Sequence, residues 1–312
     1  MHKTAFLFPG QGAQKCGMGK DFYEHSGTAR RIFDRASEVL KLDMKALCFE
    51  PNDRLNLTEY TQAALVTACL AMARTAEERG LHADLTAGLS LGEYAAIAVA
   101  GGMSDEDAIR TARLRGILMQ EAVPAGEGAM AAVLGTKTEK IEAVLQTIEG
   151  VTIANYNCPG QIVITGRKSA VEQAGEALKA AGARKVVCLN VSGPFHSPML
   201  QQAGEALLKE LQQVAWKELT VPYVTNVTAG IVTDIRESRA LLGRQVAAPV
   251  RWEQSMRYMI DSGVRIFVEI GPGKTLSGFL KKINPDAKVF SIQTMEDLEK
   301  TVLEIQKERN YD

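Results

Sequence analysis

The feature that most constrains this chain is the pentapeptide Gly88-Leu89-Ser90-Leu91-Gly92, in which a serine has a glycine two positions away on each side. The short apolar segment before it can end a strand, and the alanine-rich segment 91–100 has the composition of a helix. Such a turn exposes a serine hydroxyl as a nucleophile, because glycine has no Cβ to collide where the backbone bends sharply. The pattern indicates acyl chemistry, although G-x-S-x-G also occurs by chance in ordinary loops.

Two neighbours of Ser90 fit this interpretation. The amide of Leu91 stands at the start of the predicted helix, where a free N–H can donate to an oxyanion. Glu93 falls in the first turn of the same helix, where the helix dipole favours an anion.

The composition is that of a globular protein without a strong electrostatic partner. Apolar residues make up 46% of the chain and charged residues 23%, with 36 Lys and Arg against 37 Asp and Glu. A formal net charge of −1 argues against general binding to nucleic acid or to an anionic membrane. At 312 residues the chain exceeds one typical compact core, so we expect a large domain that carries a smaller one.

Cysteine spacing and hydropathy indicate a cytoplasmic protein. The closest two of the five cysteines, Cys48 and Cys69, are 21 positions apart, which leaves no C-x-x-C pair. The apolar run Thr4–Phe8 is too short for a signal peptide, and no apolar run suits a membrane span. No His-x-x-x-His or carboxylate cluster has metal-ligand spacing, so we expect no metal and no cofactor.

The pattern along the chain predicts two structural units. A strand at 4–8 and a loop at 9–12 precede a helix at 29–40, and strands and helices then alternate as in a parallel sheet with helical crossovers. After a turn-rich joint at 123–128 the order becomes βαββαβ, which is typical of a ferredoxin-like sandwich. The predicted fold class is therefore α/β, with a large hydrolase-like core built on a parallel sheet (1–125 and 197–312) and an inserted ferredoxin-like subdomain (126–196).

The predicted elements are as follows. Further helices are expected at 61–79, 91–100 and 105–119, and further strands of the core at 85–87, 221–225 and 265–270. In the insert, strands are expected at 129–134, 151–156, 161–166 and 185–191, and helices at 138–146 and 169–180.

A serine needs a base to take its proton, and the chain offers four histidines, His2, His25, His82 and His196. His2 is terminal, and His25 and His82 lie in polar sequence that predicts exposure. His196 lies in a loop at the predicted return from the insert to the core, where a side chain can reach the nucleophile. We predict His196 as the base; the alternative is a histidine with a structural role only.

The chain resembles the malonyl-CoA:acyl carrier protein transacylase family of fatty acid synthesis over its whole length. The resemblance rests on six motifs in order: Phe8-Pro9-Gly10-Gln11-Gly12, the G-x-S-x-G turn, Arg113-Leu114-Arg115-Gly116, Asn157-Cys158-Pro159-Gly160-Gln161, Gly193-Pro194-Phe195-His196-Ser197 and Glu269-Ile270-Gly271-Pro272-Gly273.

The resemblance implies a role for each catalytic residue. Ser90 is the nucleophile that takes the malonyl group, and His196 is its general base. The backbone amides of Gln11 and Leu91 form the oxyanion hole. The main-chain carbonyl of Gln245 orients the imidazole, which makes a dyad rather than a Ser-His-Asp triad.

The resemblance also implies substrate-binding residues. Arg115 matches the arginine that meets the free carboxylate of malonate, since a guanidinium offers paired donors to a carboxylate. Arg113 is two positions away and therefore on a different helical face. Phe195 matches a pattern associated with malonyl selection, because its bulk leaves little room for an α-methyl branch. Leu89 departs from the family, in which histidine precedes the nucleophile, and this changes the polarity of the pocket.

The implied reaction is ping-pong transfer from malonyl-CoA, a substrate rather than a cofactor, to the phosphopantetheine thiol of acyl carrier protein. The carrier is a transient partner, and the enzyme itself is expected to be a monomer. Lys168, Arg184 and Lys185 are candidate contacts for an acidic carrier, against the simpler interpretation as solvated charges.

Three alternatives remain at this stage. An acyltransferase that loads a polyketide-synthase carrier would have the same site and a different client. A serine esterase or thioesterase would share the nucleophile turn but send the ester to water, and Arg115 and the βαββαβ insert argue against it. A noncatalytic carrier-binding module would have no use for Ser90 and His196 together.

One further motif does not predict a function. Gly271-Pro272-Gly273-Lys274-Thr275 resembles the end of a phosphate-binding P-loop, but Val268 stands where the first glycine of that motif is required. We therefore expect a turn between a strand and a helix.

Overall fold

The structure is a computed structural model that describes residues 3–124 and 126–311; His2 and the predicted domain boundary at Ala125 lie outside the described residues. The α-helices are Lys20–His25 (α1), Gly27–Leu40 (α2), Met44–Phe49 (α3), Thr58–Glu78 (α4), Gly92–Val99 (α5), Asp105–Glu121 (α6), Thr138–Leu145 (α7), Lys168–Ala180 (α8), Gln201–Glu210 (α9), Ser238–Gln245 (α10), Trp252–Asp261 (α11), Thr275–Ile283 (α12) and Met295–Tyr311 (α13). The strands are Lys3–Phe8 (β1), Leu85–Gly88 (β2), Gly128–Leu134 (β3), Val151–Cys158 (β4), Gln161–Arg167 (β5), Lys185–Cys188 (β6), Tyr223–Val224 (β7), Ile231–Val232 (β8), Val264–Ile270 (β9) and Lys288–Ile292 (β10).

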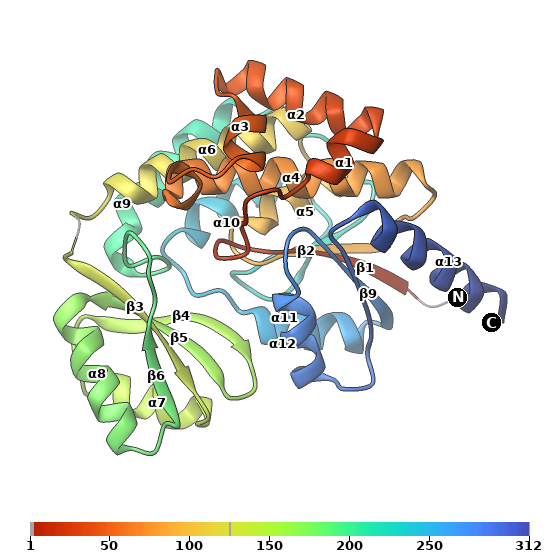
Figure 1. Ribbon diagram of the computed structural model, residues 1–312. Helices are drawn as coiled ribbons and strands as arrows, with labels where there is room; N and C mark the ends of the chain where they lie inside the picture. The colour runs from red at the N-terminus through yellow and green to blue at the C-terminus, as the bar shows by residue number, and fades with distance from the viewer. Residues whose placement is uncertain (1–2, 125, 312) are drawn as a thin grey trace.

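The main sheet has the strand order β10-β9-β1-β2-β7-β8. Its strands pair in parallel from β10 to β7, and only β8 joins antiparallel, as the second strand of a hairpin with β7. Helices cover both faces of this sheet, as a parallel sheet requires (Figure 1). The predicted α/β class with a parallel core sheet is confirmed.

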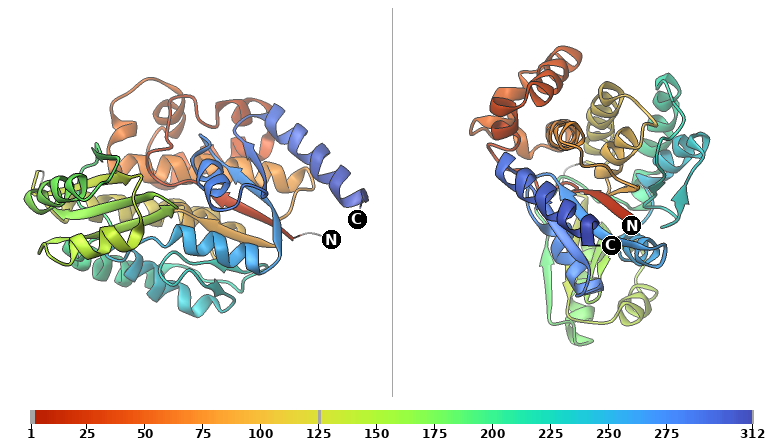
Figure 2. Two further views of the ribbon diagram at one scale, coloured as in Figure 1. Left: turned by 90° about the horizontal axis from the view of Figure 1, so that it is seen from below. Right: turned by 90° about the vertical axis from the view of Figure 1, so that its right-hand side faces the viewer.

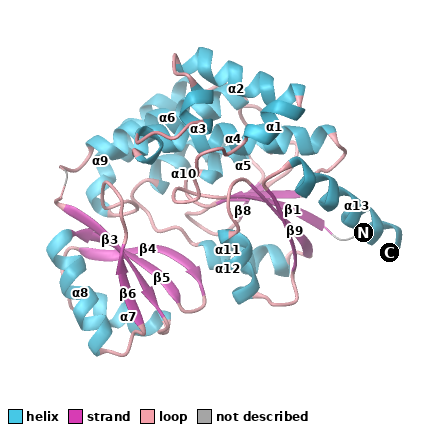
Figure 3. Ribbon diagram, viewed as in Figure 1, coloured by secondary structure: helices cyan, strands magenta, loops and turns pink. Residues whose placement is uncertain are grey.

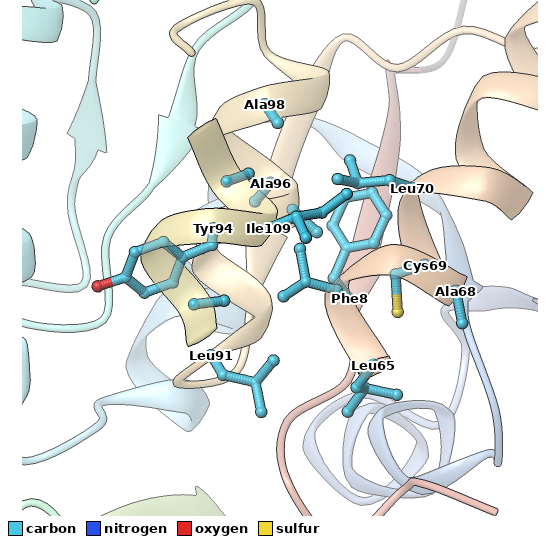
Figure 4. Packing of buried hydrophobic residues seen from close by; sticks show 14 of the residues in the cluster. Phe8, Leu65, Ala68, Cys69, Leu70, Leu91, Tyr94, Ala96, Ala98 and Ile109 are labelled. Atoms are coloured by element: carbon cyan, nitrogen blue, oxygen red, sulfur yellow. The ribbon is translucent and has the colours of Figure 1, made fainter. Parts of the chain in front are cut away.

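Side chains of β1 alternate between two hydrophobic layers. Phe6 and Phe8 pack in the larger cluster, with α2, α4, α5 and α6, whereas Ala5 and Leu7 pack on the other face, with α11 and α12. Figure 4 shows Phe8 between side chains from α4, such as Leu70, and the alanine-rich α5. The small residues of α5 let this helix lie deep in the core, directly after the nucleophile turn.

A second sheet has the order β4-β5-β3-β6 with every neighbouring pair antiparallel, which is the ferredoxin-like arrangement. Helices α7 and α8 cover its outer face (Figure 3). The opposite face contributes Met130, Ala154 and Val163 to the larger cluster. This face of the small sheet therefore packs directly on the main core. All of its strands fall within the predicted insert 126–196.

The small sheet is joined to the rest of the protein by a short strand-like pairing between β4 and the segment before α11. Asn155 bridges Val250 in parallel, the amide of Tyr156 donates to the Val250 carbonyl at 2.9 Å, and the Val250 amide donates to Ala154 at 2.8 Å. We call this pairing the seam. It fixes the chain just after Ala248 against the small sheet.

Some elements differ from their predicted bounds. The strand expected at 221–225 is only Tyr223–Val224, and the strand expected at 185–191 ends at Cys188, because the chain then turns back toward the core. The short helix Met44–Phe49 and the edge strand Lys288–Ile292 had no clear sequence pattern. In both views of Figure 2, the start of β1 lies near the end of α13. Among the described residues, no helix combines the length and apolar character needed to cross a membrane.

Candidate active site

The site lies where neighbouring parallel strands end. β1 leads into the loop 9–12, and β2, which pairs with it from Ala5 with Leu85 to Phe8 with Gly88, leads into Ser90. β7 lies on the other side of β2 and is followed by Asn226. The carboxyl ends of adjacent parallel strands are the usual place for a site in such a sheet. The sheet order therefore brings three loops that are distant in sequence to one edge.

Ser90 has a positive φ of 55°, a conformation that L-residues with a side chain rarely adopt. The flanking glycines allow this turn. A Cβ on Gly88 would lie 1.9 Å from the carbonyl carbon of Gly92, and a Cβ on Gly92 would lie 2.3 Å from the carbonyl oxygen of Phe8. Both positions therefore require glycine, as the motif predicts.

Ser90 Oγ lies 2.7 Å from Nε2 of His196, although the two residues are 106 positions apart. The other ring nitrogen, Nδ1, is 2.9 Å from the carbonyl oxygen of Gln245 and 3.1 Å from that of Ala248. Two carbonyl acceptors place the proton on Nδ1, which leaves Nε2 free to accept the Ser90 proton. His25 and His82 are exposed, as expected.

Burial holds the proposed base neutral. His196 is 3% exposed, and burial, together with the positive charge of Arg115, lowers its pKa to about 4. The Gln245 and Ala248 carbonyls that accept from Nδ1 favour the imidazolium, but burial and the charge of Arg115 outweigh them. The imidazole is therefore ready to accept a proton at neutral pH.

Arg115 is 1% exposed and lies beside the nucleophile. Its Nη2 donates to Ser90 Oγ and to Gln245 Oε1, each at 3.0 Å, and its Nη1 donates to Gln62 Oε1 at 2.8 Å. The next residue, Gly116, permits this approach, since a Cβ there would lie 2.8 Å from the carbonyl oxygen of Thr58 on α4. Burial lowers the pKa of Arg115, which still remains charged at neutral pH.

Arg113 points elsewhere, in agreement with its expected helical face. It forms an ion pair with Glu59 at 2.6 Å and stacks over the Tyr60 ring, 4.2 Å from its centroid. Of the two arginines in this motif, only Arg115 contacts Ser90.

Gln245 contacts all of the central groups. Its main-chain carbonyl accepts from His196, its side-chain oxygen accepts from Arg115, and its amide nitrogen donates to the Ser90 carbonyl at 3.0 Å. The resemblance suggested only the first of these contacts. The side chain is fully buried and bridges Ser90 and Arg115.

Three residues of the site were missed in the sequence. Gln62 binds Arg115 from α4, Asn226 accepts from the Ser90 amide at 2.6 Å through Oδ1, and Ala248 offers its carbonyl to His196. Gln62 carried a usable signal, because it is the one amide side chain of α4 and directly precedes the almost entirely apolar stretch 63–73. Asn226 and Ala248 carried none, since their contacts depend on the tertiary fold.

The two predicted oxyanion amides lie in adjoining turns. A Cβ on Gly10 would lie 2.6 Å from the carbonyl oxygen of Leu89, so the loop that carries Gln11 touches the nucleophile turn. Within the described chain, the amides of Gln11 and Leu91 donate to no protein acceptor. Both are therefore available to a bound oxyanion.

Two predicted specificity positions are apolar contacts. Phe195 is buried in the larger core cluster directly before His196. Leu89, which replaces the family's histidine, packs its side chain toward Gly10 and the cluster formed with α11 and α12. Leu89 therefore makes apolar contacts with this cluster, next to Ser90 in the chain.

The candidate carrier contacts separate into two places. Lys168 follows the end of β5 that pairs with Gly128, and a Cβ on Gly128 would touch the Pro194 ring in the His196 loop. Arg184 and Lys185 lie at the other end of β3, beside Gly135 and Leu134. The length of β3 therefore separates these two residues from the His196 loop, and only Lys168 lies near it.

The P-loop-like segment is a turn between β9 and α12, as expected. The carboxylate of Glu269 accepts from the amides of Leu276 and Ser277, at 3.1 and 2.8 Å, at the start of α12. A protein carboxylate already occupies the position that a phosphate would take at this helix start.

Together these contacts place a neutral imidazole and a buried guanidinium at one serine hydroxyl, with two amides that lack protein acceptors in adjoining turns. This set can carry out acyl transfer through a serine ester, and the cation suits an acyl group that bears its own carboxylate.

Comparisons with known proteins match one family of acyl transferases over almost the whole chain. A model of the acyl transferase domain family matches residues 5–294. The malonyl CoA-acyl carrier protein transacylase of Bacillus subtilis (strain 168) is 44% identical over 315 residues, with 99% of each protein covered. The crystal structure of malonyl CoA-acyl carrier protein transacylase from Clostridium perfringens is 41% identical, with a TM-score of 0.96 and 99% of both chains covered.

A further solved structure is a type II PKS acyl-carrier protein in complex with its malonyl-transacylase, with a TM-score of 0.92 and 38% identity. The match covers 95% of this chain and 98% of that one. Because the family model and these relatives extend over almost the whole length, this chain belongs to the malonyl CoA-acyl carrier protein transacylase family of acyl transferases.

Proposed function

We propose that this enzyme moves a malonyl group from malonyl-CoA to the phosphopantetheine thiol of an acyl carrier protein, through a malonyl ester on Ser90. The proposal rests on family membership and on one observation above all. Ser90 Oγ lies within hydrogen-bonding distance of both a neutral base, His196, and a buried cation, Arg115.

The position of Arg115 suits malonate in particular. In a malonyl ester, the carboxylate carbon lies two C–C bonds from the carbonyl carbon that is attached to Ser90 Oγ, a distance of roughly 2.5 Å. A guanidinium that reaches Ser90 Oγ therefore also reaches the carboxylate of an acyl group bound there. An acetyl group has no carboxylate and would leave the buried charge without this partner.

In the first half-reaction, Nε2 of His196 takes the proton of Ser90 Oγ as the oxygen attacks the thioester carbon of malonyl-CoA. The amides of Gln11 and Leu91 donate to the oxyanion of the tetrahedral intermediate. When the intermediate collapses, the C–S bond breaks, and the CoA sulfur leaves with the proton that His196 held. The products are free CoA and malonyl-Ser90.

In the second half-reaction, the carrier thiol gives its proton to His196 Nε2 and its sulfur attacks the ester carbonyl. The same amides hold the second oxyanion. The ester C–O bond then breaks, and Ser90 Oγ recovers the proton from His196. The Gln245 and Ala248 carbonyls keep the imidazole in the tautomer that both steps need.

The reaction is tested by mixing the enzyme with malonyl-CoA and holo carrier and measuring malonyl-carrier against free malonate. We expect malonyl-carrier as the main product, and a malonylated Ser90 peptide when the carrier is omitted. Free malonate as the main product would show a thioesterase instead. Acylation of Ser90→Ala by malonyl-CoA would remove Ser90 from its role.

The role of Arg115 is tested by comparing malonyl-CoA with acetyl-CoA in Arg115→Ala. We expect malonyl transfer to fall about 100-fold, with a much smaller effect on acetyl transfer, because only the malonyl carboxylate loses a charged partner. Arg110→Ala is the matched control, since Arg110 is on the same helix but pairs with Asp107 at the surface. An unchanged malonyl preference in Arg115→Ala would exclude this role.

The client carrier is a separate question. The solved complex with a type II PKS carrier concerns a relative with 38% identity and favours a polyketide carrier as a second candidate client. Parallel assays with a fatty acid and a polyketide holo carrier would rank the two by kcat/KM.

We further propose that the enzyme acts in the cytoplasm as a monomer and without a cofactor. The exposed large hydrophobic side chains of the described residues are Leu57, Ile231 and Leu303, and they belong to separate elements: Leu57 precedes α4, Ile231 lies in β8 and Leu303 in α13. Light scattering on the purified protein should give the mass of one chain, and a dimer mass would contradict the proposal.

A further inference from the structure

Glu93 is a buried carboxylate beside the active site that the mechanism above does not use. It lies in the first turn of α5, three residues after Ser90, and its side chain is fully buried. Among the described residues, no Lys, Arg or His nitrogen lies within ion-pairing distance of it. The positive charge of Arg115 favours the ionised form from a greater distance. Burying a carboxylate without a directly paired cation is costly, so its hydrogen bonds indicate what it does.

Oxygen Oε2 of Glu93 accepts from the amide nitrogen of the Gln245 side chain at 2.6 Å and from the backbone amide of Asn226 at 3.1 Å. Each of these two partners holds the backbone of Ser90. Gln245 donates to the Ser90 carbonyl at 3.0 Å, and Asn226 accepts from the Ser90 amide at 2.6 Å. Oxygen Oε2 of Glu93 thus contacts both residues that hydrogen-bond to the Ser90 backbone.

The same contacts fix which way the Gln245 amide points. Its nitrogen faces two acceptors, Glu93 Oε2 and the Ser90 carbonyl, while its oxygen faces the guanidinium of Arg115 at 3.0 Å. The reverse orientation would place an oxygen against two acceptors and an NH₂ group against a cation. Glu93 therefore selects the orientation in which Gln245 binds Arg115.

We propose that Glu93 is a positioning residue that acts through Gln245 to hold the Arg115 guanidinium beside Ser90, an inference that rests on the proposed function. Arg115 has three side-chain acceptors, Ser90 Oγ, Gln62 and Gln245, and Gln245 accepts from Nη2, the nitrogen that also donates to Ser90 Oγ. Loss of Glu93 frees Gln245 to rotate, and Nη2 then keeps Ser90 Oγ but loses the Gln245 oxygen that holds it in place. The effect falls mainly on acyl groups that use Arg115.

The test measures the rate of Ser90 acylation by malonyl-CoA and by acetyl-CoA with intact-protein mass spectrometry. In Glu93→Ala we expect KM for malonyl-CoA to rise about tenfold, and the malonyl-to-acetyl preference to fall about tenfold, because the buried donors of Gln245 and Asn226 lose an acceptor. A mutation that only destabilised the fold would lower both rates together and leave the preference unchanged.

Two conservative variants separate position from charge. Glu93→Gln keeps an acceptor of the same reach, and its NH₂ replaces Oε1, which has no hydrogen-bond partner among the described residues. This variant should keep the preference within about threefold. Glu93→Asp keeps the charge but is shorter by one methylene, so it should lose the preference as Glu93→Ala does. The reverse ranking of these two variants would overturn the proposal.

A double-mutant cycle tests the route through Gln245. In a Gln245→Ala background, Glu93→Ala should cause no further loss of malonyl preference, and independent, additive losses would overturn the proposal. Glu269→Gln is the matched control, because it removes another buried carboxylate that contacts neither Ser90 nor Arg115. Thermal unfolding checks that each variant is folded.

The acylation step needs no carrier, so the two proposals can fail separately. If wild-type enzyme acylates Ser90 but releases malonate to water, the transferase function is wrong while the role of Glu93 is still measured. If wild-type enzyme transfers malonyl normally and Glu93→Ala and Glu93→Asp keep the preference, the role of Glu93 is wrong.

Discussion

Arg115 acts on the proposed base as well as on the nucleophile. It donates to Ser90 Oγ, and its positive charge adds to burial in lowering the pKa of His196 to about 4. One guanidinium is thus both the proposed binding group for the acyl carboxylate and, after burial, the second cause of the low pKa of His196. When malonate neutralises Arg115, we expect His196 to become more basic at the moment when it must accept a proton.

This coupling predicts a shift in a pH profile. In Arg115→Gln, the pKa of His196 should rise toward its ordinary value of 6.5, because a nearby positive charge no longer opposes the imidazolium. The acid limb of Ser90 acylation by acetyl-CoA should therefore move to higher pH by about one unit. Stopped-flow acylation from pH 4 to 8 measures this limb. Arg110→Gln should leave it in place, and an unmoved limb in Arg115→Gln would show that the charges are uncoupled.

At the scale of single residues, the sequence predicted the proposed nucleophile and base. It did not predict the residues whose hydrogen bonds position them. Ser90 and His196 could be predicted because each lies in a recognisable loop. Asn226 could not, because its contact with the Ser90 amide spans 136 positions and exists only once β7 lies beside β2. Glu93 was expected near a helix start, but its bond to Gln245, 152 positions away, follows from the tertiary fold.

At the scale of elements, the junction of β2 and α5 depends on two glycines that leave no free volume. Gly88→Ala should destabilise the protein by more than about 3 kcal/mol, since the new Cβ would meet backbone atoms that cannot move away. Gly278→Ala is the control, because nothing lies within 4 Å of its Cβ and α12 should gain about 0.5 to 1 kcal/mol. Urea unfolding measures both changes. A Gly88→Ala protein as stable as wild type would contradict the tight junction.

The elements themselves were predictable where periodicity was long. In the insert, alternation gave each strand and helix to within a few residues, because one face of that sheet packs on helices and the other on the core. Some short elements were not predicted from the sequence. β8 has two residues, and β10 lies at an edge where its side chains are only partly buried, so neither shows a pattern. The strand expected at 221–225 is present but shorter, at Tyr223–Val224.

At the scale of the whole molecule, two buried groups have opposite effects on stability. Burial raises the pKa of Glu93 from 4.5 to about 7 and lowers that of His196 from 6.5 to about 4. Between pH 4.5 and 7 the folded state holds a proton on Glu93 that the unfolded state releases, so this group lowers stability as pH rises. Between pH 4 and 6.5 the unfolded state takes a proton that folded His196 refuses, so this group raises stability as pH rises.

The opposite contributions of Glu93 and His196 to the pH dependence of stability nearly cancel from pH 4.5 to 6.5. Replacing one of the two residues leaves the contribution of the other to be measured. Relative to wild type, Glu93→Gln should gain up to about 1.4 kcal/mol of stability per pH unit as pH rises through this range. His196→Gln should lose a similar amount over the same range. Urea unfolding at half-unit steps measures both slopes, and parallel curves for all three proteins would exclude these pKa shifts.

The seam between Asn155 and Val250 restricts how any client can reach the serine. Ala248, two residues before Val250, offers a carbonyl to His196, so a swing of the small sheet would draw that carbonyl away from the imidazole. We therefore expect the two sheets to move as one body during turnover. A protein of this build cannot close around a bulky donor. On that expectation, a donor reaches and leaves the serine without any closing movement of the small sheet.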